Sequence, residues 1–355
     1  MNKEIIAILD QLEQEKGIKR ELLVDAIIAA LETAYKKNYN ATSDEVSVEF
    51  DIETGDVKVY SLYNVVKEPM QVNDLTPDEA KEKYGEDYNP GDTVREEVTP
   101  ENFGRIAAQN ARQVIIQRIK EEEREVQFNN YSNKESELVT GKIQRESNGV
   151  YFINLDNIEG VLLPNDQMHG EDYYPDKRLK TVVKSVKQTT KGPQVLLSRT
   201  DATLVKRLFE LEVPEIYDGI VEIRSISREA GSRTKIAVFT LDDTVDSVGA
   251  CVGKDGVRVN AIVNELNGEK IDIIKWNKDP KVYISNALSP ADVLRVDIVD
   301  EDEKKARVIV PDDQLSLAIG KAGQNARLSA KLTGWKIDIK SKEQDENKDN
   351  QNEEN

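Results

Sequence analysis

The spacing of apolar residues along the first 125 positions changes from a helical period to a strand period and back. Apolar residues recur every three or four positions on both sides of Gly17, which predicts two helices within residues 1–40. Apolar and polar residues then alternate at 46–50 and 57–60 around the turn Thr54-Gly55, which predicts a hairpin. After a looser stretch with turn residues, the helical period returns from about residue 101 to 126. We expect residues 1–125 to form one α+β domain.

Residues 131–200 have short apolar runs separated by polar turns, which predicts a small β-barrel or sandwiched sheet. Three strings in this region resemble the ribosomal-protein type of OB-fold, whose loops and one face bind single-stranded RNA. The strings are Gly141-Lys142-Ile143, Gly160-Val161-Leu162-Leu163-Pro164 and Leu197-Ser198-Arg199. Lys184, Lys187 and Arg199 are the candidate RNA ligands here. A solvated strand-and-loop face explains the basic run at 177–191 equally well.

The chain repeats itself from residue 201 onward, which predicts two copies of one module at 201–277 and 278–341. Each copy has the order helix, strand, strand, helix, Gly-x-x-Gly, helix, strand. The loops are Gly253-Lys254-Asp255-Gly256 and Gly320-Lys321-Ala322-Gly323. A lone Gly-x-x-Gly is a weak signal, because helix caps produce it by chance. Two copies in the same seven-element frame are a specific one.

The chemistry of these loops favours a nucleotide backbone as the ligand. Glycine lets a phosphodiester approach without a Cβ in the way, and the following helix offers free N–H groups and a positive dipole end. The loop lysines add cations, and bases beside the loop are read at their edges, as in KH domains. The candidate RNA-binding residues are Gly253, Lys254, Asp255, Gly256 and Arg258 in the first copy, and Gly320, Lys321, Ala322, Gly323, Gln324, Asn325 and Arg327 in the second.

The distribution of charge limits how RNA can be bound. The formal net charge is −18. Residues 1–130 carry 16 Lys+Arg against 28 Asp+Glu, residues 131–339 carry 30 against 33, and residues 340–355 carry 3 against 6. The long-range basic field that attracts phosphate is absent, so RNA binding has to rely on local geometry. The polar segment 342–355 is expected to be disordered.

Catalytic and metal-dependent functions find no support in the residues. The glycines from Gly249 to Gly253 are one position too close for a P-loop, and Asp255 follows the lysine where Ser or Thr is required. Cys251 and His169 each occur singly and lie in different modules, which argues against a Cys–His pair or a metal cluster. We therefore expect no enzyme activity, cofactor or metal. The absence of a signal peptide and of a long apolar run predicts a cytoplasmic protein that does not contact membranes.

Several longer strings of the sequence are specific to one family. They are Gly104-Arg105-Ile106-Ala107-Ala108-Gln109, residues 208–216, 228–235 and 314–321, and Gln324-Asn325-Ala326-Arg327. These strings resemble the NusA family of bacterial transcription factors, and the likeness covers nearly the whole chain. The resemblance implies a domain that docks on RNA polymerase, then an OB-fold and two type II KH domains that follow nascent single-stranded RNA. It also implies roles in pausing, hairpin-dependent termination and antitermination, together with other antitermination factors.

On the long N-terminal helix, the resemblance points to Arg105, Gln109 and Arg112, at positions i, i+4 and i+7, as residues that meet polymerase. A solvated helix face is the alternative. The chain departs from the family pattern at Asp201-Ala202, where a His-Pro pair is expected, and it ends soon after the second repeat, without acidic repeats that would mask the RNA-binding face. We expect a monomer. An RNA-processing or ribosome-assembly protein that uses the same modules without polymerase stays open.

Overall fold

The computed structural model describes residues 2–16, 19–39, 46–71, 73–156, 158–190 and 192–346. The chain folds into two compact units, Met1–Glu125 and Val126–Asn355. The predicted break at Gly17 and the basic residue at 191 lie outside the described residues. None of the described helices is both long and apolar enough to cross a bilayer.

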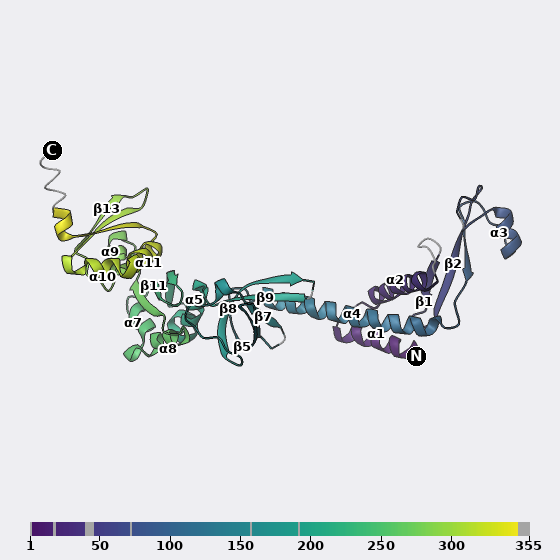
Figure 1. The fold of residues 1–355 in the computed structure, drawn as a ribbon, viewed down its shortest axis with the longest axis horizontal. Helices are drawn as coiled ribbons and strands as arrows, with labels where there is room; N and C mark the ends of the chain where they lie inside the picture. The colour runs from purple at the N-terminus through teal and green to yellow at the C-terminus, as the bar shows by residue number, and fades with distance from the viewer. Residues whose placement is uncertain are drawn as a thin grey trace. The chain divides into compact units, whose positions relative to one another are not determined.

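The first unit packs three helices against a four-stranded sheet (Figure 1). In the sheet, β2 pairs antiparallel with β1 and β4 and parallel with β3. Leu9, Ile27 and Phe103, from three different helices, are fully buried in its core. The elements are α1 (Asn2–Lys16), α2 (Arg20–Tyr39), β1 (Val46–Phe50), β2 (Val57–Val65), β3 (Asp74–Leu75), α3 (Pro77–Tyr84), β4 (Thr93–Glu97) and α4 (Phe103–Ser132), which ends in the second unit.

The two helices and the hairpin predicted for this unit are confirmed, and the region expected to be loose is more ordered than predicted. Thr76 opens a capping box with Glu79, Pro77 occupies the first turn, and Gly85 closes α3 in the left-handed region. Strand β4 then pairs with β2. The capping box is visible in the sequence as Thr-Pro-Asp-Glu, so this helix was predictable.

The second unit begins with a closed barrel of five strands, in the order β5-β6-β7-β9-β8. The barrel interior explains two glycines of the sequence pattern. A Cβ at Gly141 would lie 2.3 Å from Ile153 Cγ2, and one at Gly160 would lie 2.5 Å from Leu197 Cδ1. The strands are β5 (Leu138–Ser147), β6 (Val150–Asn154), β7 (Glu159–Leu162), β8 (Arg178–Thr189) and β9 (Gly192–Ser198).

Two repeats with the same topology follow the barrel. Each repeat has a three-stranded sheet in which the first strand pairs antiparallel with the second and the second pairs parallel with the third. The first repeat comprises α5 (Ala202–Glu212), α6 (Pro214–Tyr217), β10 (Val221–Glu229), β11 (Arg233–Thr240), α7 (Ser247–Val252), α8 (Val257–Glu265) and β12 (Lys270–Lys275). The second comprises α9 (Pro280–Ala287), β13 (Arg295–Asp300), β14 (Lys305–Val310), α10 (Leu315–Ile319), α11 (Gln324–Thr333) and β15 (Lys336–Ser341).

The two repeats pack directly on each other. One face of the first sheet carries Ala237 and Ile274, which form a buried cluster with Tyr283 of α9 and Leu332 of α11. The Ser225 hydroxyl lies 2.8 Å from the Tyr283 hydroxyl and donates to the Leu332 carbonyl at 2.9 Å. The outer face of the first sheet is therefore covered by helices of the second repeat.

The predicted disorder of residues 342–355 is wrong for the first five of them. Residues 342–346 are helical, and the Asp345 side chain is buried. Arg295 of β13 donates to the Asp345 carboxylate at 2.8 Å, which ties this turn to the second sheet. Residues 347–355 lie outside the described residues.

Candidate nucleic-acid interface

Both Gly-x-x-Gly loops adopt one backbone conformation between two helices. The first glycine is at φ/ψ 73/170° in one copy and 77/172° in the other, a region open essentially to glycine alone. The third and fourth positions are both left-handed. Their φ/ψ values are 53/25° at Asp255 and 75/12° at Gly256, against 52/31° at Ala322 and 74/15° at Gly323. The repeat in the sequence is thus a repeat in backbone geometry.

Each loop exposes its lysine beside an uncapped helix end. Lys254 and Lys321 are exposed. Helices α8 and α11 begin after Gly256 and Gly323, and no side chain of the described residues caps either N-terminus. Uncapped N–H groups and the positive end of the helix dipole therefore follow the lysine closely along the chain. This arrangement suits a phosphate group.

Two residues predicted to bind RNA also make contacts that support the loops. Arg258 and Asn325 occupy the same position, two residues after their loops. Arg258 Nη1 donates to the Ala250 carbonyl at 2.6 Å and to Glu215 at 2.9 Å. Asn325 Nδ2 donates to the equivalent carbonyl, that of Leu317, at 3.2 Å.

The prediction that Asn325 contacts RNA is wrong, because its side chain is buried, at 4% exposed. Its Nδ2 also donates to the Leu288 carbonyl, which joins α11 to the end of α9. The guanidinium of Arg258 is likewise held by partners within the first repeat. Aligning the two copies residue by residue would have revealed this shared role, since both side chains pack beneath the first glycine of the loop, Gly253 or Gly320.

Gln324 and Arg327 lie beside the second loop but are bonded to the first repeat. Gln324 Nε2 donates to Glu229 and to Ser232 Oγ, both at 2.8 Å. Arg327 Nε donates to Glu229 at 2.7 Å, and its Nη1 donates to the Ala322 carbonyl at 3.1 Å. Glu229 was not predicted as part of the site. It is 95 and 98 positions from these partners, so only the folded chain brings them together.

The three candidates in the barrel have different environments. Lys187 is exposed on β8. Lys184 is about half-exposed, and its Nζ donates to both carboxylate oxygens of Asp166, at 2.9 and 3.0 Å. Arg199 is completely buried, so the prediction that it contacts RNA is wrong.

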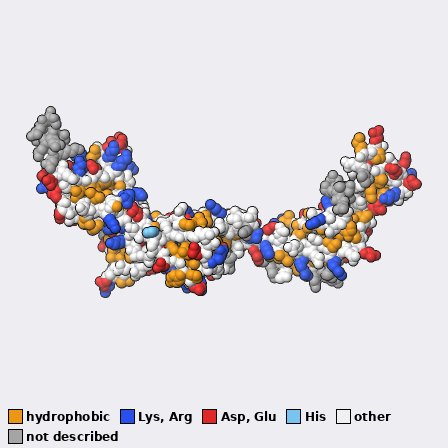
Figure 2. Space-filling view, in the orientation of Figure 1, with side chains coloured by type: hydrophobic (Ala, Val, Ile, Leu, Met, Phe, Trp, Pro, Cys, Tyr) orange, Lys and Arg blue, Asp and Glu red, His pale blue; other side chains and the backbone are white. Residues whose placement is uncertain are grey.

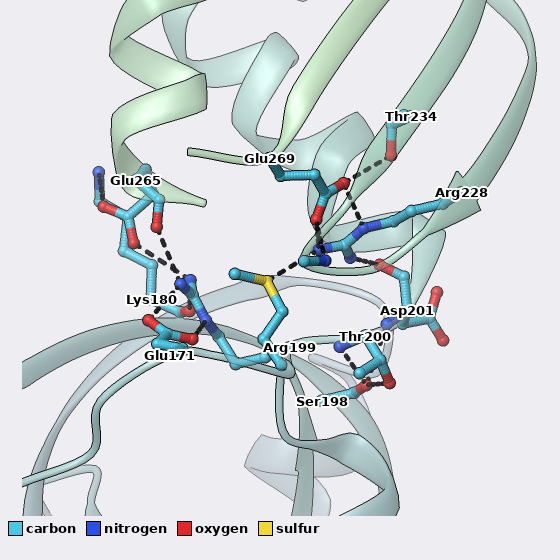
Figure 3. A network of polar contacts seen from close by, with 12 residues as sticks. Glu171, Lys180, Ser198, Arg199, Thr200, Asp201, Arg228, Thr234, Glu265 and Glu269 are labelled. Carbon is cyan, nitrogen blue, oxygen red and sulfur yellow. Dashed lines mark hydrogen bonds and ion pairs between the residues drawn. The ribbon is translucent and has the colours of Figure 1, made fainter. Parts of the chain in front are cut away.

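Arg199 instead joins the barrel to the first repeat (Figure 3). Its guanidinium donates to Glu171 at 2.7 and 3.0 Å and to the Glu265 carbonyl at 2.8 Å. Burial, the largest single influence, would raise the pKa of the Glu171 carboxyl. The hydrogen bonds and charge of Arg199, the Tyr173 hydroxyl and the Lys177 charge together outweigh burial and hold that pKa below its ordinary value. The pair is a buried structural ion pair.

Arg228 forms the second half of this junction, also seen in Figure 3. It makes two 2.9 Å hydrogen bonds to Glu269 and one of 2.6 Å to the Asp201 carbonyl. A Cβ at Gly231 would lie 2.7 Å from the His169 carbonyl oxygen of the barrel. The string 228–235 therefore forms an interface between modules.

The second unit has a mixed surface charge and a buried cysteine. On the face in Figure 2, Lys and Arg are interspersed with Asp and Glu. Cys251 is buried, and burial together with nearby Glu215 raises the pKa of its thiol to about 12. Within the described ranges, no group of three or more His, Cys, Asp or Glu is placed to hold a metal ion.

Comparison with known proteins matches three segments of this architecture to family models. Residues 4–125 match the NusA N-terminal domain, 199–276 the NusA-like first KH domain, and 280–347 the NusA-like second KH domain. A Bacillus subtilis protein named transcription termination/antitermination protein NusA is 53% identical over 342 residues, covering 96% of this chain and 91% of the relative. The chain belongs to the NusA family.

Other proteins with the same name are more distant and still span the chain. The relative from Mycobacterium bovis is 43% identical and covers 94% of this chain and 92% of its own. The relative from Rickettsia conorii is 38% identical, and the match covers 99% of this chain and 70% of the relative. A solution structure of the N-terminal domain of NusA from B. subtilis is 43% identical over 35% of this chain and 99% of that one, with a TM-score of 0.32.

Membership in the NusA family assigns the two repeats and the function. The repeats are KH domains, and the protein is a transcription termination/antitermination factor. The two Gly-x-x-Gly loops lie within the two KH segments. The predicted family and its KH domains are thus confirmed.

The departure from the NusA pattern at Asp201 has a structural explanation. Asp201 is the N-cap of α5, and its side chain accepts a hydrogen bond from the Thr203 N–H at 2.8 Å. Its own N–H donates to Ser198 Oγ at 3.1 Å. Aspartate is a strong N-cap, so this residue starts the first helix of the KH domain directly after the barrel.

The three residues predicted to meet polymerase line one groove in the NusA N-terminal domain. Arg105, Gln109 and Arg112 are exposed along α4. The groove has a volume of about 530 Å³, and its apolar walls come from α1 and α4. The apolar lining residues are Ile5, Ile8, Ala108, Ile115, Ile116 and Ile119.

Proposed function

We propose that this NusA-family factor binds RNA polymerase through its first unit and nascent single-stranded RNA through its second. It acts by binding, in the cytoplasm and together with other antitermination factors, and it catalyses no reaction. The observation that carries the RNA part is the shared backbone conformation of the two loops, each with an exposed lysine beside an uncapped helix N-terminus. Backbone N–H groups, a helix dipole and lysine together form a recurring phosphate site.

The barrel is proposed to be an OB-fold that contributes a further RNA contact. Its strand order β5-β6-β7-β9-β8 corresponds to a five-stranded Greek-key barrel of this type. Exposed Lys187 and half-exposed Lys184 are the remaining candidates, since Arg199 is buried. Lys184 has to exchange Asp166 for phosphate, so we expect Lys187 to contribute more.

The first unit is proposed to dock on polymerase through the groove between α1 and α4. Apolar walls with two exposed arginine side chains at the rim suit an amphipathic, acidic segment of a partner protein. The unit itself is acidic, which limits attraction to RNA and favours a protein partner. Pausing, termination and antitermination then follow from holding RNA and polymerase at once.

The RNA part is tested by replacing Lys254 and Lys321 with alanine in the full chain. The first glycines are poor test positions, because a Cβ at Gly253 would lie 2.7 Å from Arg258 Cγ and would strain the loop. We expect roughly fivefold weaker binding of single-stranded RNA per lysine, about 1 kcal/mol for a partly exposed charge. The salt slope should become shallower by about 0.7 per lost phosphate contact. Equal affinity in the double variant would contradict the phosphate assignment.

A matched control changes the same charge elsewhere. Lys37→Ala and Lys81→Ala remove two exposed lysines from the first unit. They should leave RNA affinity unchanged. For the polymerase part, Arg105→Glu with Arg112→Glu should abolish capture of purified RNA polymerase, whereas Lys37→Glu with Lys81→Glu should not. RNA binding without any capture by the wild type would favour an RNA-processing or ribosome-assembly role.

A further inference from the structure

The two Gly-x-x-Gly loops share a backbone but differ in what surrounds them. The second loop is followed by Gln324 and Arg327, and the same positions after the first loop hold Val257 and Asn260. Val257 is 67% exposed. The second loop alone has a carboxylate from the other KH domain beside it among the described residues. This carboxylate is Glu229, at the end of β10.

The two carboxylate oxygens of Glu229 accept hydrogen bonds from two different side chains of α11. One oxygen accepts from Gln324 Nε2 at 2.8 Å and the other from Arg327 Nε at 2.7 Å. These hydrogen bonds, that from Arg327 first, hold the pKa of Glu229 below its ordinary value, so it is ionised at neutral pH. The carboxylate therefore meets Arg327 as a charged partner.

Arg327 is fixed at two points and leaves one side of its guanidinium available. Nε is held by Glu229, and Nη1 donates to the carbonyl of Ala322 inside the loop, at 3.1 Å. In the part of the chain that the structure describes, Nη2 has no hydrogen-bond partner, and the side chain is 48% exposed. An arginine held in this way presents a planar donor at the loop without losing rotamer freedom when a phosphate arrives.

We propose that Glu229 of the first KH domain is a positioning residue for RNA binding at the second Gly-x-x-Gly loop. It holds the Arg327 guanidinium against the loop so that Nη2 meets the phosphodiester that the loop cradles. This inference rests on the proposed RNA-binding function. One consequence is that the second loop is complete only while the two KH domains are packed together, because Glu229 reaches it across their interface.

The opposite role for Glu229 is a competitor that RNA must displace from Arg327. The geometry favours positioning, because Arg327 contacts the loop and Glu229 through different nitrogens, Nη1 and Nε. Binding a phosphate at Nη2 breaks neither contact. The negative charge of Glu229 is moreover already compensated by the Arg327 charge. The two roles predict opposite signs for removal of the carboxylate.

The experiment compares Glu229→Ala and Glu229→Gln with the wild type, using a short labelled single-stranded RNA in fluorescence anisotropy over a salt series. We expect Glu229→Ala to bind three- to tenfold more weakly, the loss from releasing one ordered side chain. The salt slope should become shallower by about 0.7, since one phosphate contact is lost. Glu229→Gln keeps an acceptor for Arg327 Nε and should bind at least as tightly as the wild type.

Controls separate positioning from structural damage. Glu222→Ala removes another glutamate of β10 that pairs with an arginine, Arg224, at 3.1 Å, and it should change neither affinity nor slope. In an Arg327→Ala background, Glu229→Ala should have no further effect on affinity. Thermal unfolding of each variant shows whether the fold is kept.

Three results would overturn the proposal. Tighter binding or equal affinity in Glu229→Ala would make the carboxylate a competitor or a bystander. Weaker binding with an unchanged salt slope would reduce Glu229 to a structural role. A loss of affinity that persists in the Arg327→Ala background would do the same. Failure of the proposed function is distinct, because it appears as unchanged RNA binding when Lys254 and Lys321 are replaced.

Discussion

Replacing Arg199 with methionine separates the structural part of the second unit from its RNA-binding part. The Arg199 side chain is fully buried, and Glu171, its main partner, is 3% exposed. Methionine fills most of the volume but removes the positive charge, so a carboxylate is left inside the protein. We expect a loss of stability without a specific loss of RNA affinity.

The size of the effect follows from the contacts that are broken. Removing one partner of a buried ion pair costs about 3–5 kcal/mol, because the other charge stays buried. Here Glu171 keeps the Lys177 ammonium at 3.2 Å and the Tyr173 hydroxyl at 2.8 Å, which favours the lower end of that range. At about 2–4 °C per kcal/mol for a unit of this size, the melting temperature should fall by about 6–12 °C.

The assay is thermal unfolding followed by circular dichroism, with RNA affinity measured well below the transition. Lys187→Ala is the matched control, because it removes an exposed charge from β8 and should lower RNA affinity without changing the melting temperature. A decrease of less than about 2 °C in Arg199→Met would refute the buried-pair argument. So would a large loss of RNA affinity in fully folded Arg199→Met protein, since it would restore Arg199 as a ligand.

The pH dependence of this difference provides a second check. The pKa of Glu171 is lowered in the folded protein, so the pair stabilises the fold above the unfolded-state pKa, and this contribution is lost as pH falls through the folded pKa. Without Arg199, burial should raise the Glu171 pKa instead. The gap in melting temperature between the two proteins should be full at pH 7. It should begin to narrow as pH falls through the raised Glu171 pKa of the variant, above the ordinary value of about 4.3, and should keep narrowing until pH is below the lowered pKa of the wild type. A gap that is constant from pH 7 to acid would contradict the electrostatic origin.

Three further outcomes follow from single sites. Cys251, buried and with its thiol pKa raised to about 12, should react with iodoacetamide only after unfolding, as mass spectrometry would detect; rapid labelling of the folded chain would contradict its burial. Asp201→Ala removes the N-cap of α5 and should lower the free energy of unfolding, measured with denaturant, by about 1 kcal/mol. Asp201→Asn keeps a capping side chain and should retain the wild-type stability. An equal loss of stability in both variants would argue against capping. Gly141→Val should destabilise the barrel by about 1–3 kcal/mol or more, because its Cβ would overlap Ile153. Unchanged stability would contradict the close contact between Gly141 and Ile153.

The elements and the two loops were predictable because they depend on local sequence. Alternation and helical spacing locate the strands and helices, and a glycine that must adopt φ near 75° with an extended ψ has few substitutes. The duplication then supplied an internal comparison that a single loop lacks. The helix α3 was missed although its capping box, Thr76 to Glu79, is equally local.

The roles of individual charged side chains were less predictable. The sequence favours Arg199 as an RNA ligand because it is basic and lies in an OB-like string, but its partners Glu171 and Glu265 are 28 and 66 positions away. Asn325 was misjudged as an RNA contact, and Glu229 was missed, because their partners are also distant in the sequence. Residue type and spacing give the chemistry of a side chain, whereas burial and long-range pairing decide whether that chemistry faces the ligand or the core.

The two KH domains have different side chains on the outer faces of their sheets. Packing, rather than ligand binding, explains this difference. Strand register aligns Ser225 and Ala237 of the first sheet with Arg295 and Ile309 of the second. The small side chains of Ser225 and Ala237 lie under α9 and α11. A long charged side chain at either position would separate the two domains. In the second domain the same face receives the short turn at 342–346, whose Asp345 pairs with Arg295. The glycine loops, by contrast, keep one backbone conformation in both copies, so the feature that survives the divergence is the Gly-x-x-Gly corner itself.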